Sequence, residues 1–119
     1  MIQIPANATI FVMHEAISFH TRIDGSCAVA RLVLHKEPME GAFFVFRNKS
    51  GVSIRILYYD GSGFWNCEKR LSKGTFNKAW PKGNAEAPCS NLLVRELQVL
   101  LWAGNPASAK FPELWHKVA

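Results

Sequence analysis

Three short apolar segments separated by two strong turn sequences constrain the fold of this chain more than any other feature. The segments are Phe43 to Phe46, Ile54 to Tyr59 and Phe64 to Cys67. Between them stand Asn48-Lys49-Ser50-Gly51 and Asp60-Gly61-Ser62-Gly63, which are rich in the Asn, Asp and Gly residues that favour tight turns. The pattern predicts an antiparallel β-meander.

The second turn predicts a register for the last two strands. If Asp60 pairs with Gly63, each apolar residue faces an apolar residue and each polar residue faces a polar one. The predicted pairs are Tyr58 with Trp65, Ile56 with Cys67, and Arg55 with Glu68. We therefore expect Tyr58, Ile56, Trp65 and Cys67 in the core. Because Phe43 to Phe46 is apolar at every position, this strand is predicted to be central and covered on both sides.

The flanking sequence adds short strands, two helices and a loop. Ile10 to Met13 is predicted to be a strand. A helix is predicted from Ile23, capped by Asp24, with His35 and Lys36 near its C-terminal end and Pro38 after it. Phe76 to Trp80 is predicted to be a short strand and Pro81 to Pro88 a loop. A second helix is predicted from about Asn91 to Ala103, capped by Ser90 or Asn91. Its apolar side carries Leu93, Leu97, Leu100 and Leu101.

The length of 119 residues is that of one domain with its own core. We expect a compact α+β domain over residues 1–104: an antiparallel meander sheet of three to five strands with two helices packed on one face. Residues 105–119 are expected to form an irregular C-terminal tail. Phe111 and Trp115 are apolar enough to dock on the domain or on a partner, and they are the candidate partner-binding residues.

Cysteine usage and the N-terminal sequence indicate a cytoplasmic protein. Cys27, Cys67 and Cys89 are an odd set with wide spacing and without a CxxC pair, so neither a disulfide framework nor a zinc site is predicted. The first residues have no basic segment, and the apolar run from Ala8 to Met13 is too short for a signal peptide or a membrane span.

Few residues have the spacing that catalysis requires. His14-Glu15 resembles the start of a zinc-protease motif, but Ser18 stands where the second His is needed. Asp24 and Asp60 already have roles as a helix cap and a turn residue, which leaves no convergent acids for a metal-dependent nuclease. We therefore predict no enzyme activity, no metal, no cofactor and no small-molecule substrate.

The formal net charge of +5 and the pI near 9.4 favour a polyanionic partner. The polar face of the meander and its turns could contact a phosphate backbone, with Lys78 and Lys82 nearby. Aromatic stacking on bases is disfavoured because the register turns Tyr58 and Trp65 inward. The alternative for the polar face is a solvated surface with an Arg55–Glu68 pair. The candidate nucleic-acid contacts are Arg47, Lys49, Arg55, Lys69, Arg70 and Lys73.

In these residues the chain resembles the TnpB-type accessory proteins of the IS-sixty-six insertion-sequence family, the products of the second open reading frame. The resemblance covers about Ala8 to Gly104 and is specific in combination rather than in any single motif. The residues that carry it are Ile23-Asp24-Gly25, Gly41 to Arg47, Arg55 to Gly63, Lys69-Arg70-Leu71 with Lys73-Gly74 and Phe76, Trp80-Pro81, and Glu96-Leu97 with Leu100-Leu101 and Gly104.

The resemblance implies a non-catalytic bacterial accessory protein of transposition, encoded beside the transposase of the same mobile element. It implies contact with duplex DNA, assembly with that transposase, or both. The alternative is a protein-interaction module without direct DNA binding. A diverged or domesticated copy is indicated by Phe19 to Arg22, where the family usually has Met-Arg-Lys-Gly, by Tyr59 in place of Trp, and by Leu93 in place of a Ser or Thr cap.

Overall fold

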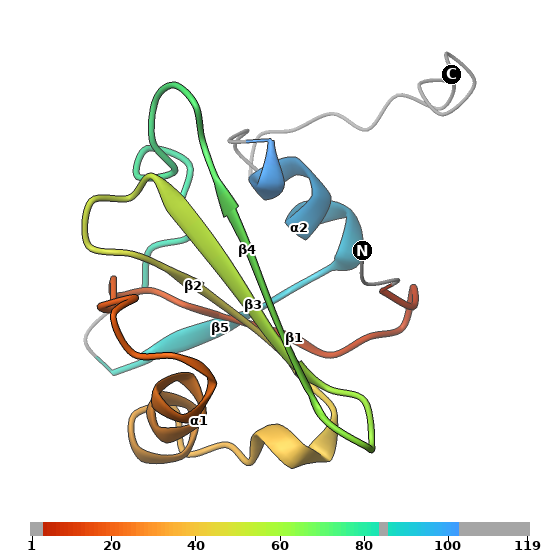
Figure 1. Cartoon of the computed structure of the whole chain (residues 1–119). Coiled ribbons are helices and arrows are strands. Elements are labelled where there is room, and N and C mark those ends of the chain that lie inside the picture. The colour runs from red at the N-terminus through yellow and green to blue at the C-terminus, as the bar shows by residue number, and fades with distance from the viewer. Residues whose placement is uncertain (1–3, 84–85, 103–119) are drawn as a thin grey trace.

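The computed structural model describes residues 4–83 and 86–102. Five strands, two α-helices and one 3₁₀ helix follow one another along the described chain (Figure 1). In order they are β1 (Ile10–Met13), α1 (Ile23–Leu32), the 3₁₀ helix η1 (Pro38–Glu40), β2 (Phe43–Arg47), β3 (Ser53–Tyr59), β4 (Phe64–Arg70), β5 (Cys89–Leu92) and α2 (Val94–Leu101). The predicted α+β class is confirmed.

The strands form one sheet in the order β4-β3-β2-β1-β5, so β2 is central as predicted. The meander β2-β3-β4 is antiparallel, and all three predicted pairs of its second hairpin are present, with Asp60 N–H donating to Gly63 O at 3.0 Å. The sheet is mixed, however, because β1 pairs with β2 in parallel. The connection between these strands contains α1, and a crossover of this kind joins parallel strands.

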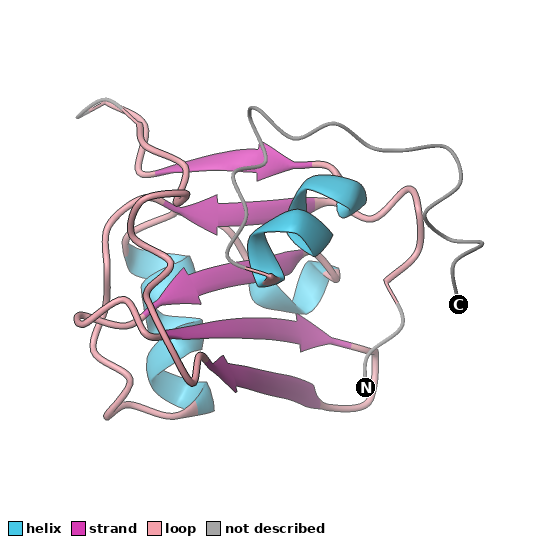
Figure 2. Cartoon of the chain, turned by 90° about the horizontal axis from the view of Figure 1, so that it is seen from above, coloured by secondary structure: helices cyan, strands magenta, loops and turns pink. Residues whose placement is uncertain are grey.

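The two helices cover opposite faces of the sheet, which corrects the prediction that both pack on one face (Figure 2). Cys27 and Ala30 of α1 pack with Phe44 and Phe46, whereas Leu97 of α2 packs in the other cluster. Successive residues of a strand point to opposite faces. The uniformly apolar β2 therefore supplies Phe44 and Phe46 to one core and Phe43 and Val45 to the other.

Helix α1 begins at the predicted residue but is shorter and is capped differently. Its N-cap is Arg22, without a side-chain cap, and Asp24 lies in the first turn, where a carboxylate faces the positive end of the helix dipole. The helix ends at Leu32, and His35 has a φ of 55°. His35 and Lys36 therefore lie beyond the helix, which ends well before Pro38.

The segment before α2 differs from the prediction. Ser90 and Asn91 are not helix caps, because they pair with Val12 and Phe11 as part of β5. At the N-terminus of α2 the backbone N–H of Leu93 donates a hydrogen bond to the Glu96 carboxylate at 2.7 Å, as in a capping box.

Two aromatic predictions are wrong. Phe76 to Trp80 is not a strand but a turn in which only Phe76 and Trp80 are buried, and the Trp80 indole N–H donates to Met13 O at 2.8 Å. Trp65 is 51% exposed rather than in the core, because β4 is an edge strand and α2 lies toward its other end, where Lys69 binds Leu101 O. Tyr58 is half-buried and stacks on Phe43, with 4.0 Å between the ring centres.

The predicted tail of residues 105–119, with Phe111 and Trp115, lies outside the described residues. Among the helices that the structure describes, none is long and apolar enough to cross a membrane.

Candidate nucleic-acid interface

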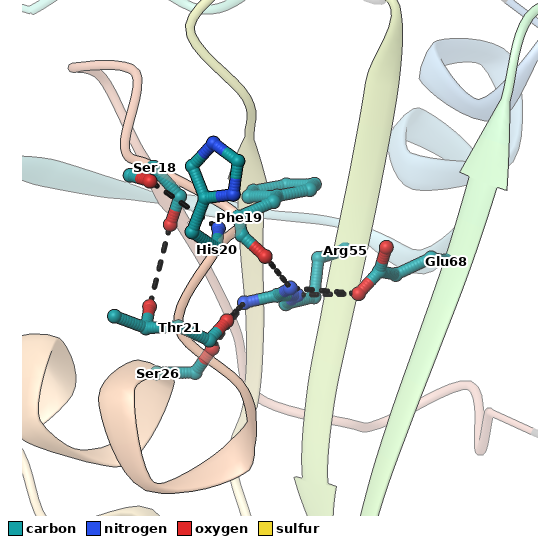
Figure 3. A network of polar contacts seen from close by, with 7 residues as sticks. All are labelled: Ser18, Phe19, His20, Thr21, Ser26, Arg55 and Glu68. Atoms are coloured by element: carbon teal, nitrogen blue, oxygen red, sulfur yellow. Dashed lines mark hydrogen bonds and ion pairs between the residues drawn. The ribbon is translucent and has the colours of Figure 1, made fainter.

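Arg55, a candidate phosphate contact, is buried, with 2% of its surface exposed. It lies on β3 beneath the segment that leads into α1 (Figure 3). A guanidinium has five N–H donors. In Arg55 they serve Glu68, the carbonyls of Phe19 and Thr21, and the Ser26 hydroxyl, at 2.7 to 3.1 Å.

No donor of Arg55 is left for a phosphate. The alternative prediction, a solvated face with an Arg55–Glu68 pair, is confirmed for the pair, which is present at 2.7 Å, but Arg55 itself is buried rather than solvated. The Phe19 ring lies 4.2 Å from the guanidinium carbon and shields it from water. Arg55 joins the lead-in of α1 to the sheet and is a structural residue.

Arg47 and Lys69 are half-buried and also bind within the protein. Arg47 donates to the Asn77 side chain at 2.6 Å and to His14 O at 3.0 Å. Lys69 Nζ donates to Leu101 O at 2.7 Å, at the C-terminal end of α2 where a cation is favoured by the helix dipole. Arg47 and Lys69 therefore hold loops and a helix in place, and their hydrogen bonds within the protein compete with any contact to a ligand.

The remaining candidates, Lys49, Arg70 and Lys73, are exposed, and within the described part of the chain no hydrogen bond or ion pair occupies their side chains. They come from the β2–β3 turn, the end of β4 and the loop after it. Hydrogen bonds from Phe76 N–H to Gly51 O and from Leu71 N–H to Val52 O hold these segments together at 2.7 and 2.8 Å. Both segments lie at the upper left of Figure 1.

Lys78 and Lys82 join this group from the same loop. Asn77, directly before Lys78, binds Arg47 at the C-terminal end of β2. Trp80 binds the carbonyl of Met13 at the C-terminal end of the neighbouring strand β1. We call the set Lys49, Arg70, Lys73, Lys78 and Lys82 the basic end. Carboxylates near it include Glu15, which is exposed, Glu68, which pairs with Arg55, and Glu86, which makes an interaction within the protein.

The opposite end of the sheet carries three carboxylates and two cations. Asp60 lies in the β3–β4 turn, Glu37 and Glu40 lie around η1 just before β2, and they are accompanied by Lys36 and by Arg31, which pairs with Glu37. Hydrogen bonds from the Ser62 backbone, the Trp65 indole, the Gly63 backbone and the Ser62 hydroxyl lower the pKa of Asp60 to about 2. The hydrogen bond from Arg31 likewise lowers the pKa of Glu37. The cations of the basic end therefore lie at the other end of the strands from Asp60, Glu37 and Glu40.

Other reactive side chains are dispersed or engaged. Nowhere in residues 4–83 and 86–102 do three or more His, Cys, Asp or Glu residues come together as metal ligands. His14 lies between Ala87 O and the Ser90 hydroxyl, 2.7 and 2.9 Å from its two ring nitrogens. The three cysteines are free, and burial raises the pKa of the Cys27 and Cys89 thiols.

An apolar pocket of about 330 Å³ lies on the α2 face of the sheet, beside the last turn of α2. The exposed Trp102, with 81% of its surface accessible, stands at its rim. Its lining includes Ile4, Ile54, Ile56, Cys67, Leu101 and Trp102.

This architecture defines a small α+β protein with a group of exposed cations at one end of its sheet. The chain belongs to the family of IS66 Orf2 like proteins, which matches residues 8–110. It is thus an insertion-sequence associated protein of an accessory family, and the resemblance found in the sequence is confirmed.

Two curated relatives come from Sinorhizobium fredii (strain NBRC 101917 / NGR234). The uncharacterized protein y4hO is 38% identical over 55 residues, which is 46% of each chain. The uncharacterized protein y4jC is 34% identical over 67 residues, which is 56% of this chain and 57% of the relative. The chain thus spans about half the length of these relatives. No solved structure matches it.

Proposed function

We propose that the protein is a non-catalytic accessory factor of insertion-sequence transposition that contacts duplex DNA through the basic end. The observation that carries this proposal is the grouping of five exposed cations, Lys49, Arg70, Lys73, Lys78 and Lys82, on a turn, a strand end and a loop that the fold ties together. Membership of the family indicates that the process is transposition, and the polyanion that we expect these cations to contact is the DNA of the insertion sequence. We infer that the protein acts in the bacterial cytoplasm, where that DNA lies.

The chemistry of the basic end favours contact with phosphates rather than with bases. Four of its five cations are lysines, which act as mobile point charges on turns and loops. Phosphate contacts position a protein without reading sequence. The expected binding is therefore weakly sequence-dependent and strongly salt-dependent.

Equilibrium binding to a duplex at several salt concentrations tests this proposal. Each phosphate contact contributes about 0.9 to the slope of log affinity against log salt. The variant with both Lys49→Gln and Lys73→Gln should remain folded and lose about 1.8 from that slope. Absence of binding at low salt, or an unchanged slope in this variant, would overturn the proposal.

A second candidate function is docking on the transposase of the same element through an apolar side chain of that partner. The observation that favours it is the apolar pocket beside the exposed Trp102. Phe111 and Trp115 of the tail remain candidate contacts for the same partner.

Co-purification with the transposase tests this second candidate. Trp102→Ala tests the pocket, and deletion of residues 105–119 tests the tail, in each case with circular dichroism as the control for folding. Retention of the transposase by both variants contradicts this candidate and leaves the test of DNA contact unaffected.

A further inference from the structure

The outer edge of β4 is open in the described part of the chain, because this seven-residue strand pairs only with β3. The other edge strand, β5, has four residues. Pairing of β4 with β3 runs without a bulge from Ser53–Arg70 to Tyr59–Phe64, and β4 contains no proline. It is therefore a long and regular edge of the kind that pairs with another strand.

The charges on β4 protect this edge less than their number suggests. Charged side chains on an edge strand normally disfavour strand addition. Here Glu68 binds the buried Arg55, and Lys69 reaches across the α2 face to Leu101 O. Only Arg70, at the end of the strand, makes no hydrogen bond or ion pair with another described residue.

The hydrogen bonds to β3 decide which main-chain groups point outward. Leu71 N–H donates to Val52 O, and Gly63 O accepts from Asp60 N–H, so odd-numbered residues of β4 bond to β3. The N–H and C=O groups of the even-numbered residues therefore point to the open edge. These residues are Phe64, Asn66, Glu68 and Arg70.

We propose that β4 pairs in antiparallel orientation with β4 of a second copy of this chain, about a two-fold axis at Cys67. Cys67 is the midpoint of the strand, so this register pairs all seven residues. It also places outward main-chain groups opposite outward main-chain groups, as an antiparallel ladder requires. Two five-stranded sheets thereby become one continuous sheet.

The side chains are complementary in this register. The Asn66 amide faces the Glu68 carboxylate of the second copy, which still has Oε1 available because Arg55 binds Oε2. The Phe64 ring faces Arg70 of the second copy, and an aromatic ring beside a cation is a favourable pair. Trp65 lies opposite Lys69 of the second copy, whose ammonium binds Leu101 O within its own copy. Each pair occurs twice by symmetry.

The positions of Asp60 and Arg70 at the two ends of β4 support the same orientation. Antiparallel pairing brings the β3–β4 turn of each copy, with ionised Asp60, towards the Arg70 end of β4 in the other copy. Parallel pairing would instead place equal charges side by side. The pairing does not depend on DNA contact, and its tests contain no DNA.

Solution mass tests the dimer. Sedimentation equilibrium of the full chain should give twice the monomer mass of 13.3 kDa. Asn66→Pro removes only an outward N–H, which an edge strand tolerates, and should halve the mass. Asn66→Ala retains that N–H and should remain dimeric. A monomeric wild-type chain, or an Asn66→Pro variant that is folded and dimeric, would overturn the proposal.

Oxidative crosslinking tests the register on the wild-type chain without dependence on a folding variant. Opposite residues at a non-hydrogen-bonded site have Cα atoms about 4.5 Å apart, within the range that a disulfide spans. Treatment with diamide should therefore give a Cys67-linked dimer on a non-reducing gel. Cys67→Ser, which retains Cys27 and Cys89, should give none. Absence of a Cys67-dependent dimer in the wild type would exclude this register.

Discussion

At position 55 the arginine binds protein rather than solvent, because each of its N–H groups already has an acceptor. Arg55→Met would leave Glu68 and two backbone carbonyls without their donor. We expect the free energy of unfolding to fall by about 2 to 3 kcal/mol, less than for a fully buried pair because Glu68 can be solvated. Urea denaturation measures this loss, and the folded variant should keep its DNA affinity.

Arg70→Met is the matched control, since both arginines project from the same face of the sheet. Arg70 is exposed and makes no hydrogen bond or ion pair with another described residue. Its replacement should change the free energy of unfolding by less than about 0.5 kcal/mol but weaken DNA binding. Equal losses of stability in the two variants would contradict the separate roles of these cations.

Ionised Asp60 stabilises the folded protein, and we expect this stabilisation to be lost at acid pH. Its pKa is about 2 in the folded protein against an ordinary 3.8, so its stabilising effect is complete above about pH 4 and is lost as the pH falls through 2. Asp60→Asn removes the charge and turns one oxygen into a donor. The variant should melt below the wild type at pH 7, with a difference that shrinks towards pH 2. A pH-independent difference in melting temperature would exclude this origin.

Two leucines that the sequence pattern places on the same side of the predicted second helix can test where α2 begins. Leu97 is fully buried against the sheet, whereas Leu93 is 55% exposed and precedes the helix. Leu97→Ala should lower the free energy of unfolding by about 2 to 4 kcal/mol through lost contacts and a cavity. Leu93→Ala should cost less than about 0.5 kcal/mol. Comparable losses, measured by urea denaturation, would place the start of α2 earlier than the structure does.

The elements that the sequence predicts well are those defined by local chemistry. The β2-β3-β4 meander and its register follow from turn residues and alternation within a short stretch. Strand β5 does not, because Cys89 to Leu92 is continuous with the helical pattern of α2 and becomes a strand only through pairing with distant β1. The parallel β1–β2 pair and the helices on opposite faces are also set by contacts distant in sequence.

The same limit applies to the candidate interface. Alternation correctly places Arg55 and Arg70 on one polar side, but nothing local shows that the α1 segment covers the first and leaves the second open. Trp65 has the periodicity of a core residue and is half exposed because β4 is at the edge of the sheet. Lys78 and Lys82 join the basic end because the buried Trp80 fixes their loop.

Across the whole molecule, the position of charge matters more than its total. The basic end collects cations from the β2–β3 turn, the end of β4 and the loop after it. At the other end of the strands lie Asp60, Glu37 and Glu40, and the cations there, Arg31 and Lys36, contact Glu37 and the Phe11 ring. A polyanion should therefore approach with one orientation, as fields of this kind steer charged partners. A protein that bound DNA through net charge alone would have no such preference.

Two double variants with the same net charge separate these alternatives. Lys78→Gln with Lys82→Gln and Arg31→Gln with Lys36→Gln each lower the formal net charge from +5 to +3 (5 − 2 = 3). The first pair removes cations from the basic end, while Arg31 binds Glu37 and Lys36 lies over the Phe11 ring. The first variant should lose about 1.8 from the salt slope of DNA binding, and the second should keep the wild-type slope. Equal losses would mean that DNA responds to total charge, and the basic end would then have no special role.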